Sequence, residues 1–259
     1  MRLSEMSWKD VAGYLDGCRA LIVPVGTCEQ HGLHLPLATD TLIAEAFATR
    51  ISEATGVAMA PTVGYGVNLP CDRFVPGTAG FSPEALRAFV TDVLEDWERQ
   101  GFRQFFIVTA HGCAIDGYSF AHQEALKQGA LPLLAEPACG DGHCDVSILF
   151  PYWTDISDIL TAQDGVEHAC EAETSLMLFL RPDLVRMDLA VDAAEGPDTR
   201  FRAFPEGVGT AQPAPGWSGA EGRPSAATAE KGRLVFERCL NPMVRHVSEK
   251  VGRTVREYP

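Results

Sequence analysis

Short apolar runs alternate along the chain with longer stretches in which apolar residues recur at helical spacing. The apolar runs predict strands at residues 20–25, 57–63, 102–109 and 131–136. Helical spacing predicts helices at residues 39–54, 83–100, 115–128 and 229–253, and Ser82 followed by Pro83 is typical of a helix start. Strands that are apolar on both faces require cover on both. The alternation therefore predicts an α/β fold, a three-layer α/β/α sandwich with a central, mostly parallel sheet.

Composition and charge narrow the class of protein. The chain has 259 residues, which we interpret as one domain spanning residues 1–259. The formal net charge of −14 disfavours nucleic-acid binding, because no cluster of Lys and Arg in the sequence offsets it. No apolar run is long enough to cross a bilayer, and no secretory signal precedes the first strand. We therefore expect a cytoplasmic protein with neither nucleic acid nor membrane as a partner.

Carboxylates and imidazoles gather where the predicted strands end. Glu29 and His31 follow the first strand and, two residues apart in extended chain, point the same way. Asp40 starts the next helix and can return to the same point, while His111 follows the strand at 102–109. Because the carboxyl ends of parallel strands meet at one edge of a sheet, we expect these side chains close together. Mixed carboxylate and imidazole ligands suit zinc, manganese or iron, and a shared Asp is the usual bridge between two such ions.

A further polar segment, residues 167–175, precedes an apolar run. A helix that begins there can aim Glu173 and His168 toward the same edge of the sheet. Glu171 and Glu173 stand two positions apart, so they lie on different helical faces and should not both reach the ions. Acids at a helix start also interact favourably with the helix dipole, and polar residues near strand ends are often turn formers and caps. Helix-dipole interaction, turn formation and capping therefore remain alternatives to metal binding for each of these residues taken singly.

Taken together, these motifs resemble the creatininase (creatinine amidohydrolase) family. The resemblance rests on segments that follow one another in the expected order: Gly26-Thr-Cys-Glu29-Gln-His31-Gly with Asp40, Pro76-Gly-Thr78, Thr109-Ala-His111-Gly, His168-Ala-Cys-Glu171-Ala-Glu173-Thr-Ser, and residues 222–232. It implies the same three-layer fold, a homo-oligomer that is commonly a hexamer, and hydrolysis of a carbon–nitrogen bond in a small amide.

Carried over position by position, the resemblance implies two divalent metal ions per chain, held by Glu29, His31, Asp40, His111 and Glu173. Glu29 and His111 would hold one ion and His31 the other, with Asp40 between them. Creatininase itself completes the second site with a Glu two residues after the histidine, but that position is Cys113 here. We therefore assign Glu173, and a Cys113 thiolate remains an alternative ligand.

The segments expected to line the pocket depart from the family pattern. Cys113 stands in a stretch that is glycine-rich in most relatives, and the loop with Asp72 and Arg73 replaces a stretch that usually contains Glu-His. Trp153 is a candidate for capping the pocket. We therefore predict Cys113, Asp72, Arg73 and Trp153 as substrate contacts, and the substrate stays open among amides, formamides and cyclic amides.

The resulting hypothesis is a metal-dependent hydrolase that attacks a small-molecule, non-peptide amide with a metal-activated water. His168 or Glu171 would protonate the leaving nitrogen. One alternative is a peptidase of the same family that trims a cofactor-precursor peptide. A second is a catalytically altered, metal-containing binding protein. A third is a hydrolase that uses Cys113 or Cys170 as nucleophile, with His111 or His168 as base.

Overall fold

The computed structural model describes residues 1–69, 72, 74–112, 126–128, 144–193 and 216–253. At its centre lies a parallel sheet of four strands in the order β2-β1-β3-β4. The strands are β1 (Ala20–Pro24), β2 (Ala58–Met59), β3 (Gln104–Val108) and β4 (Asp145–Leu149). Every residue of β1 is buried, as expected for an inner strand of a sheet covered on both faces.

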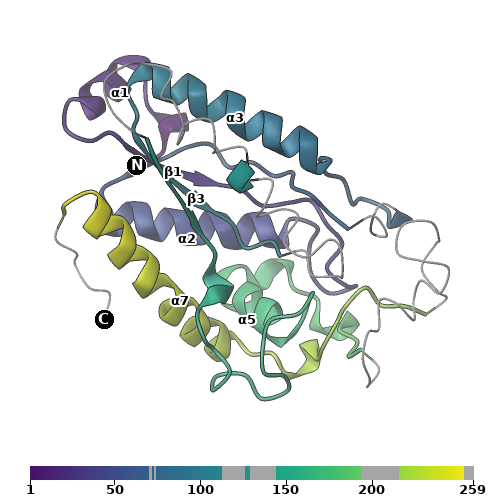
Figure 1. Cartoon of the computed structure of the whole chain (residues 1–259). Coiled ribbons are helices and arrows are strands. Elements are labelled where there is room, and N and C mark those ends of the chain that lie inside the picture. Colours follow the sequence, from purple (N-terminus) through teal and green to yellow (C-terminus); the bar gives the residue numbers. More distant parts are fainter. Residues whose placement is uncertain (70–71, 73, 113–125, 129–143, 194–215, 254–259) are drawn as a thin grey trace.

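Helices cover both faces of the sheet (Figure 1). One face carries α2 (Thr39–Thr55), α5 (Glu171–Leu180) and α7 (Ala229–Lys250), and the other carries α1 (Trp8–Leu15) and α3 (Pro83–Gln100). Short 3-10 helices form parts of the connections: η1 (Leu3–Glu5), η3 (Pro151–Trp153), η4 (Pro182–Leu184), η5 (Met187–Leu189) and η6 (Pro224–Ala226). The predicted three-layer α/β/α sandwich is confirmed.

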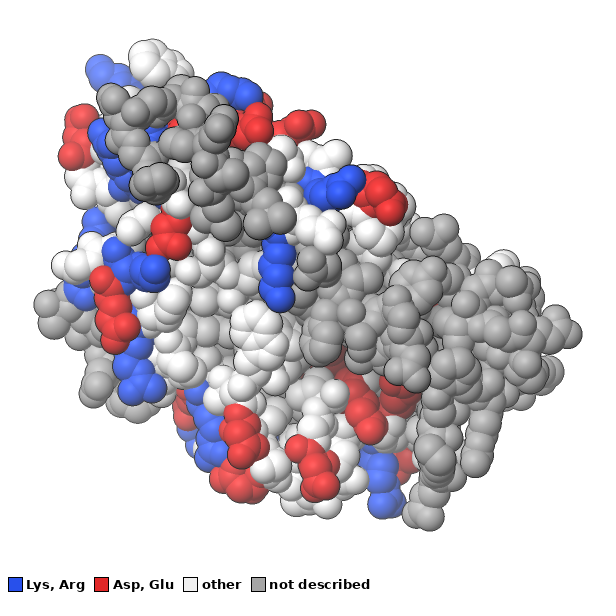
Figure 2. Space-filling model, in the orientation of Figure 1, with Lys and Arg blue, Asp and Glu red and all other residues white. Residues whose placement is uncertain are grey.

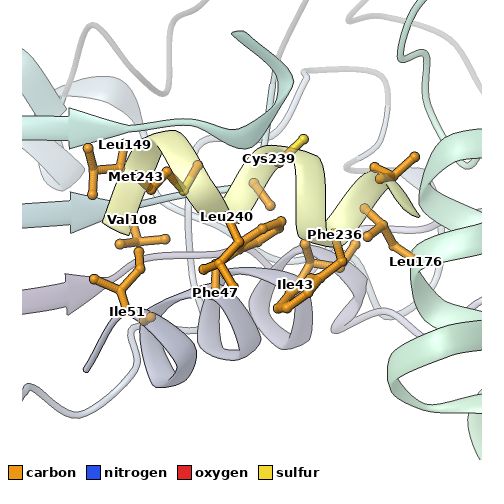
Figure 3. Close-up of a cluster of buried hydrophobic side chains, with 14 of the residues drawn as sticks. Ile43, Phe47, Ile51, Val108, Leu149, Leu176, Phe236, Cys239, Leu240 and Met243 are labelled. Carbon is orange, nitrogen blue, oxygen red and sulfur yellow. The ribbon is translucent and has the colours of Figure 1, made fainter. Parts of the chain in front are cut away.

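Alternate residues of each strand pack into different apolar cores, because successive strand side chains point to opposite faces. Ile22 belongs to the core beneath α2, α5 and α7, whereas its neighbour Leu21 belongs to the core beneath α3. In the first core, Phe47 of α2 stacks on Phe236 of α7 with ring centroids 4.4 Å apart (Figure 3). This aromatic contact ties the two helices together over the sheet.

The crossing of α5 and α7 requires a glycine. A Cβ added to Gly232 of α7 would lie 1.9 Å from the carbonyl oxygen of Ser175 in α5. Only a residue without a side chain lets the two backbones approach so closely. The contact fixes the position of α5, whose first turn contains Glu173.

Helix limits are closer to prediction than strand limits. α3 begins and ends as predicted, because the Ser82 hydroxyl accepts from the Ala85 N–H and Gly101 ends the helix in a left-handed conformation. The predicted strand 57–63 pairs as a named strand only over Ala58–Met59, since Pro61 has no N–H for the ladder. The prediction lacked β4 altogether. The predicted helix 115–128 lies mostly, and the predicted strand 131–136 wholly, outside the described residues.

The described surface has mixed charge, with acidic and basic side chains beside one another on the face in Figure 2. Neighbouring residues pair on the helices, as in Arg233–Glu237 of α7 and Arg99–Glu95 of α3. In the part of the chain that the structure describes, no helix combines the length and apolar content needed to cross a membrane.

Candidate metal centre

Acids and histidines from separate segments meet at the carboxyl edge of the sheet. The loop after β1 carries two of them, the segment after β3 one, and the first turns of α2 and α5 one each; they are Glu29, His31, His111, Asp40 and Glu173. Each is buried, with at most 5% of its surface exposed. The parallel strands bring these segments together, because their carboxyl ends share one edge.

The five side chains form two groups that share Asp40. In the first group, Nδ1 of His111 lies 3.0 Å from Oδ2 of Asp40 and 3.4 Å from Oε2 of Glu29. In the second, Nε2 of His31 lies 3.4 Å from Oδ1 of Asp40 and 3.8 Å from Oε2 of Glu173. Within each group one donor atom per residue lies within 4.8 Å of the others. Asp40 thus turns one oxygen toward each group.

Backbone groups orient the two histidine rings. Nε2 of His111 lies 2.7 Å from the Val67 carbonyl oxygen, and Nδ1 of His31 lies 3.0 Å from the Glu29 carbonyl oxygen. A carbonyl only accepts hydrogen bonds, so each of these nitrogens carries the ring proton. The other nitrogen of each ring then faces the carboxylates and can offer its lone pair to a cation once it carries no proton. This is the arrangement usual for metal-binding histidines.

The electrostatics of the cluster suit a cation. Nε2 of His31 and Oδ2 of Asp40 are buried, and among the described residues neither has a hydrogen-bond partner of good geometry. Burial alone would lower the pKa of His31, but the charges of Asp40, Glu173 and Glu29 raise it to about 10. Burial raises the pKa of Glu173 to about 7, against the opposing effect of His31. Protons therefore neutralise the metal-free cluster, and divalent ions held by the same donors would neutralise it in their place.

His168 lies beside this cluster. Its Nδ1 is 3.8 Å from Oε2 of Glu29, and its ring centroid is 4.4 Å from that of His31. Its Nε2 is 2.6 Å from the Gln30 carbonyl oxygen, which accepts the Nε2 proton. His168, Glu29 and His31 also place donor atoms within 4.8 Å of one another. The ring therefore turns Nδ1 toward the centre.

The carboxylate of Glu171 has partners other than the candidate metal ligands, which speaks against its expected catalytic role. Its carboxylate pairs with Lys231 and accepts from the N–H groups of Thr161 at 3.0 Å and Ala162 at 2.8 Å. Burial would raise the pKa of Glu171, but these bonds lower it below its usual range. Glu171 is thus an ionised acceptor that joins the loop before α5 to α7, and its geometry does not support a role as proton donor.

The predicted substrate contacts are only partly described. Asp72 is fully buried, and its Oδ1 accepts from Nε2 of Gln30 at 3.3 Å. Trp153 is 57% exposed in η3 and packs edge-on against Phe150. Arg73 and Cys113, the latter also proposed as ligand or nucleophile, lie outside the described residues.

Cys170 does not fit the role of nucleophile. Its thiol is fully buried in the core, and burial raises its pKa to about 12. A nucleophilic cysteine needs the thiolate near neutral pH. Cys170 thus packs as an apolar side chain before α5.

Sequence reasoning missed Gln30. Its Nε2 also lies 3.1 Å from the Gly219 carbonyl oxygen, and its Oε1 accepts from the Gly32 N–H. The Gln30 side chain thus connects the loop after β1 with Gly219 and Asp72. Its position between Glu29 and His31 could have indicated that Gln30 lies at the centre. Polar residues are common in loops, however, so the residue type alone did not distinguish it.

Known proteins with similar sequences belong to the family that the sequence motifs resemble. The profile of the creatininase family, described as creatinine amidohydrolase, matches residues 4–247. The chain is 27% identical to the creatinine amidohydrolase of Pseudomonas putida, with 96% of each chain covered. It is 31% identical to the mycofactocin precursor peptide peptidase of Mycolicibacterium smegmatis, which covers 85% of this chain and 81% of that one.

Solved structures show the same fold. A crystal structure of creatinine amidohydrolase (creatininase) matches with a TM-score of 0.80 at 24% identity and covers 98% of both chains. Similar creatininase structures include a manganese form and a zinc–zinc form of a variant, at TM-scores of 0.77 and 0.76 and 26% identity, each covering 96% of this chain and 98% of the other. With a family match over nearly its whole length, this chain belongs to the creatininase family of hydrolases.

Proposed function

We propose that this chain is a metal-dependent amidohydrolase that cleaves a non-peptide carbon–nitrogen bond of a small molecule. The bond would be that of an amide, a formamide or a cyclic amide. The cofactors would be two divalent ions per chain, zinc, manganese or iron, in keeping with the manganese and zinc forms of similar creatininases.

The observation that carries the proposal is the division of Asp40 between two donor groups. Its two oxygens face different histidines, at 3.0 Å and 3.4 Å. A single buried ion pair would need only one of these contacts. A carboxylate with one imidazole and one further carboxylate on each side is the donor pattern of hydrolytic two-metal sites.

In this proposal each residue has a distinct task. Glu29 and His111 hold one ion, and His31 and Glu173 hold the other. When bound, ions of this kind lower the pKa of water from 15.7 to about 7 and polarise a carbonyl oxygen. The chain itself supplies fixed ligand atoms, because backbone carbonyls hold both histidine rings.

The proposed proton carrier is His168. Hydrolysis consumes one water, breaks the C–N bond and leaves a carboxylic acid and an amine, so a proton must reach the leaving nitrogen. Since the Nε2 proton of His168 points to the Gln30 carbonyl oxygen, Nδ1 is the atom that can accept and return that proton. Asp72 and Trp153 remain the proposed substrate contacts among the described residues.

A peptidase is the second candidate function. Its support is the 31% identity to the mycofactocin precursor peptide peptidase, which exceeds the 27% identity to the creatinine amidohydrolase. The same donor set would hydrolyse a peptide bond by the same chemistry, so the two proposals differ only in the substrate. A catalytically altered binding protein would keep the metal and lack turnover.

Metal content in ligand variants tests the proposal. After loading with manganese or zinc, wild type should hold about two ions per chain, and Glu29→Gln and Glu173→Gln about one each. Asp40→Asn should hold close to none, whereas Asp183→Asn on the exposed η4 should match wild type. Turnover of formamides, cyclic amides and peptides, absent in Asp40→Asn, then separates the candidate functions. A wild-type protein that binds no metal after loading would remove the proposal.

The proposal extends to assembly and location. We propose a homohexamer in the cytoplasm that acts on a small amide. Light scattering coupled to size exclusion and cell fractionation would test these two points, and a monomer that retains full activity would contradict the first.

A further inference from the structure

A buried asparagine joins three segments next to the candidate metal centre. Asn68 is 6% exposed. Its Oδ1 accepts from the Thr27 hydroxyl at 2.5 Å, and its Nδ2 donates to the carbonyl oxygens of Cys28 at 3.0 Å and Ala79 at 3.2 Å. These partners fix the amide orientation, because the reversed amide would set an oxygen against two carbonyls.

One of the segments that Asn68 joins carries Glu29 of the centre, and the segment of Asn68 itself contacts His111. Cys28 directly precedes Glu29, and Val67 directly precedes Asn68. The Val67 carbonyl accepts the His111 ring proton at 2.7 Å. Asn68 therefore links two features of the centre. On one side it follows Val67, whose carbonyl orients His111; on the other its amide holds the carbonyl of Cys28, which precedes Glu29. The side chains of His111 and Glu29 meet at 3.4 Å in the centre.

The surrounding contacts leave Asn68 little freedom. Thr27 is fully buried, and its hydroxyl also accepts from the Gly66 N–H at 3.2 Å. Its carbonyl accepts from Thr41, which follows Asp40 in α2, at 2.9 Å. A Cβ on Gly80 would lie 3.0 Å from Nδ2 of Asn68 and 2.5 Å from the Gly66 carbonyl oxygen. The network thus reaches all three residues of one donor group.

The other donor group shares Asp40 and the backbone of Glu29 with the first, but its own ligands have further direct supports. The ring of His31 is held by the Glu29 carbonyl at 3.0 Å, and Glu173 accepts from the Ala169 N–H at 2.7 Å. Neither of these two contacts involves the side chain of Asn68. A change at Asn68 should therefore disturb the two groups unequally.

We propose that Asn68 is a positioning residue for the group formed by Glu29, Asp40 and His111. Its side-chain amide holds the segment that orients His111 against the segment that carries Glu29. It touches neither ion nor substrate, and it acts through the Val67 carbonyl and the Cys28 backbone. The inference rests on the proposed two-metal function.

Cobalt titration of the full-length, metal-stripped protein tests the inference. The visible absorption of bound Co²⁺ reports ligand geometry and gives an affinity for each ion. Asn68→Ala should lower the affinity for one of the two Co²⁺ ions about 10- to 100-fold, the usual effect of removing a contact that supports a metal ligand. It should also change the visible spectrum of that ion. The other ion should bind within about threefold of wild type. Thr27→Val, which removes the hydroxyl that donates to Asn68 and accepts from the Gly66 N–H, should give a smaller loss for the same ion.

Control variants separate positioning from general stability. Thr27→Ser keeps the donor and should restore wild-type affinity, and Asn241→Ala alters an exposed asparagine of α7. Urea denaturation establishes that each variant folds. If Asn68→Ala does not fold, Thr27→Val takes its place in the titration. Two ions bound with wild-type affinity, or both weakened equally, in a folded Asn68→Ala or Thr27→Val protein would overturn the inference. A wild type that fails to bind two cobalt ions would instead overturn the two-metal proposal.

Discussion

Binding of metal at the centre should release at least about 1.9 protons per chain at pH 6 from His31 and Glu173. The perturbation is saturation of the metal-free protein with manganese. Both residues must lose their protons to act as ligands. Carboxylates around His31 raise its pKa to about 10, and burial raises that of Glu173 to about 7.

The magnitude follows from these values. At pH 6 a group of pKa about 10 is fully protonated, and one of pKa about 7 is about nine-tenths protonated, which together make about 1.9 protons. With their ordinary values of 6.5 and 4.5 the same two groups would hold only about 0.8. Other ligands can only add to the release. The affinity for manganese should rise about tenfold per pH unit for each proton released.

Isothermal titration in two buffers with different heats of ionisation measures this release. Glu173→Gln should lower the number of protons released by at least about 0.9, because the Gln side chain has no carboxyl proton to release. Glu167→Gln is the matched control, since burial also raises the pKa of Glu167 but its carboxylate is not in the centre. A release below about one proton at full occupancy would refute the reasoning.

Further predictions concern the supports of the centre. Gly232→Ala should cost about 1–3 kcal/mol or more of unfolding free energy, since its Cβ meets Ser175, whereas Gly165→Ala, with open space around it, should be neutral; equal urea midpoints would contradict this. Glu171→Gln should lower stability by about 1–3 kcal/mol by leaving Lys231 unpaired, yet keep wild-type metal content; loss of an ion would point to a direct role. Burial, with a smaller effect of His31, lowers the pKa of His34 to about 4, below its usual 6.5. The neutral His34 therefore contributes fully to the free energy of unfolding above pH 6.5, and this contribution is lost as the pH falls toward 4. Between pH 7 and pH 5, wild type should therefore lose about 1–2 kcal/mol more than His34→Gln in urea denaturation, and parallel losses would exclude this.

Local patterns predicted α2, α3 and α7 well, missed α1 and predicted the strands less completely. The Ser82 cap and Gly101 are short-range signals, so α3 has its predicted limits. β4 escaped prediction because Asp145 and Ser147 interrupt its apolar residues, and an edge position in the described sheet tolerates such polar residues. Its pairing with β3 depends on residues far away in sequence.

The sequence by itself determined the layered α/β fold and the set of acids and histidines expected at the strand ends. Strand-end placement is encoded locally by the alternation of apolar runs and polar segments. Only the tertiary structure decided which of Glu171 and Glu173 faces the centre, because one turn of α5 offers both and Lys231 of α7 pairs with the first. It also decided the ring orientation of His111 and the placement of Asn68. Both depend on backbone carbonyls from other segments, and no local pattern in a sequence specifies such distant contacts.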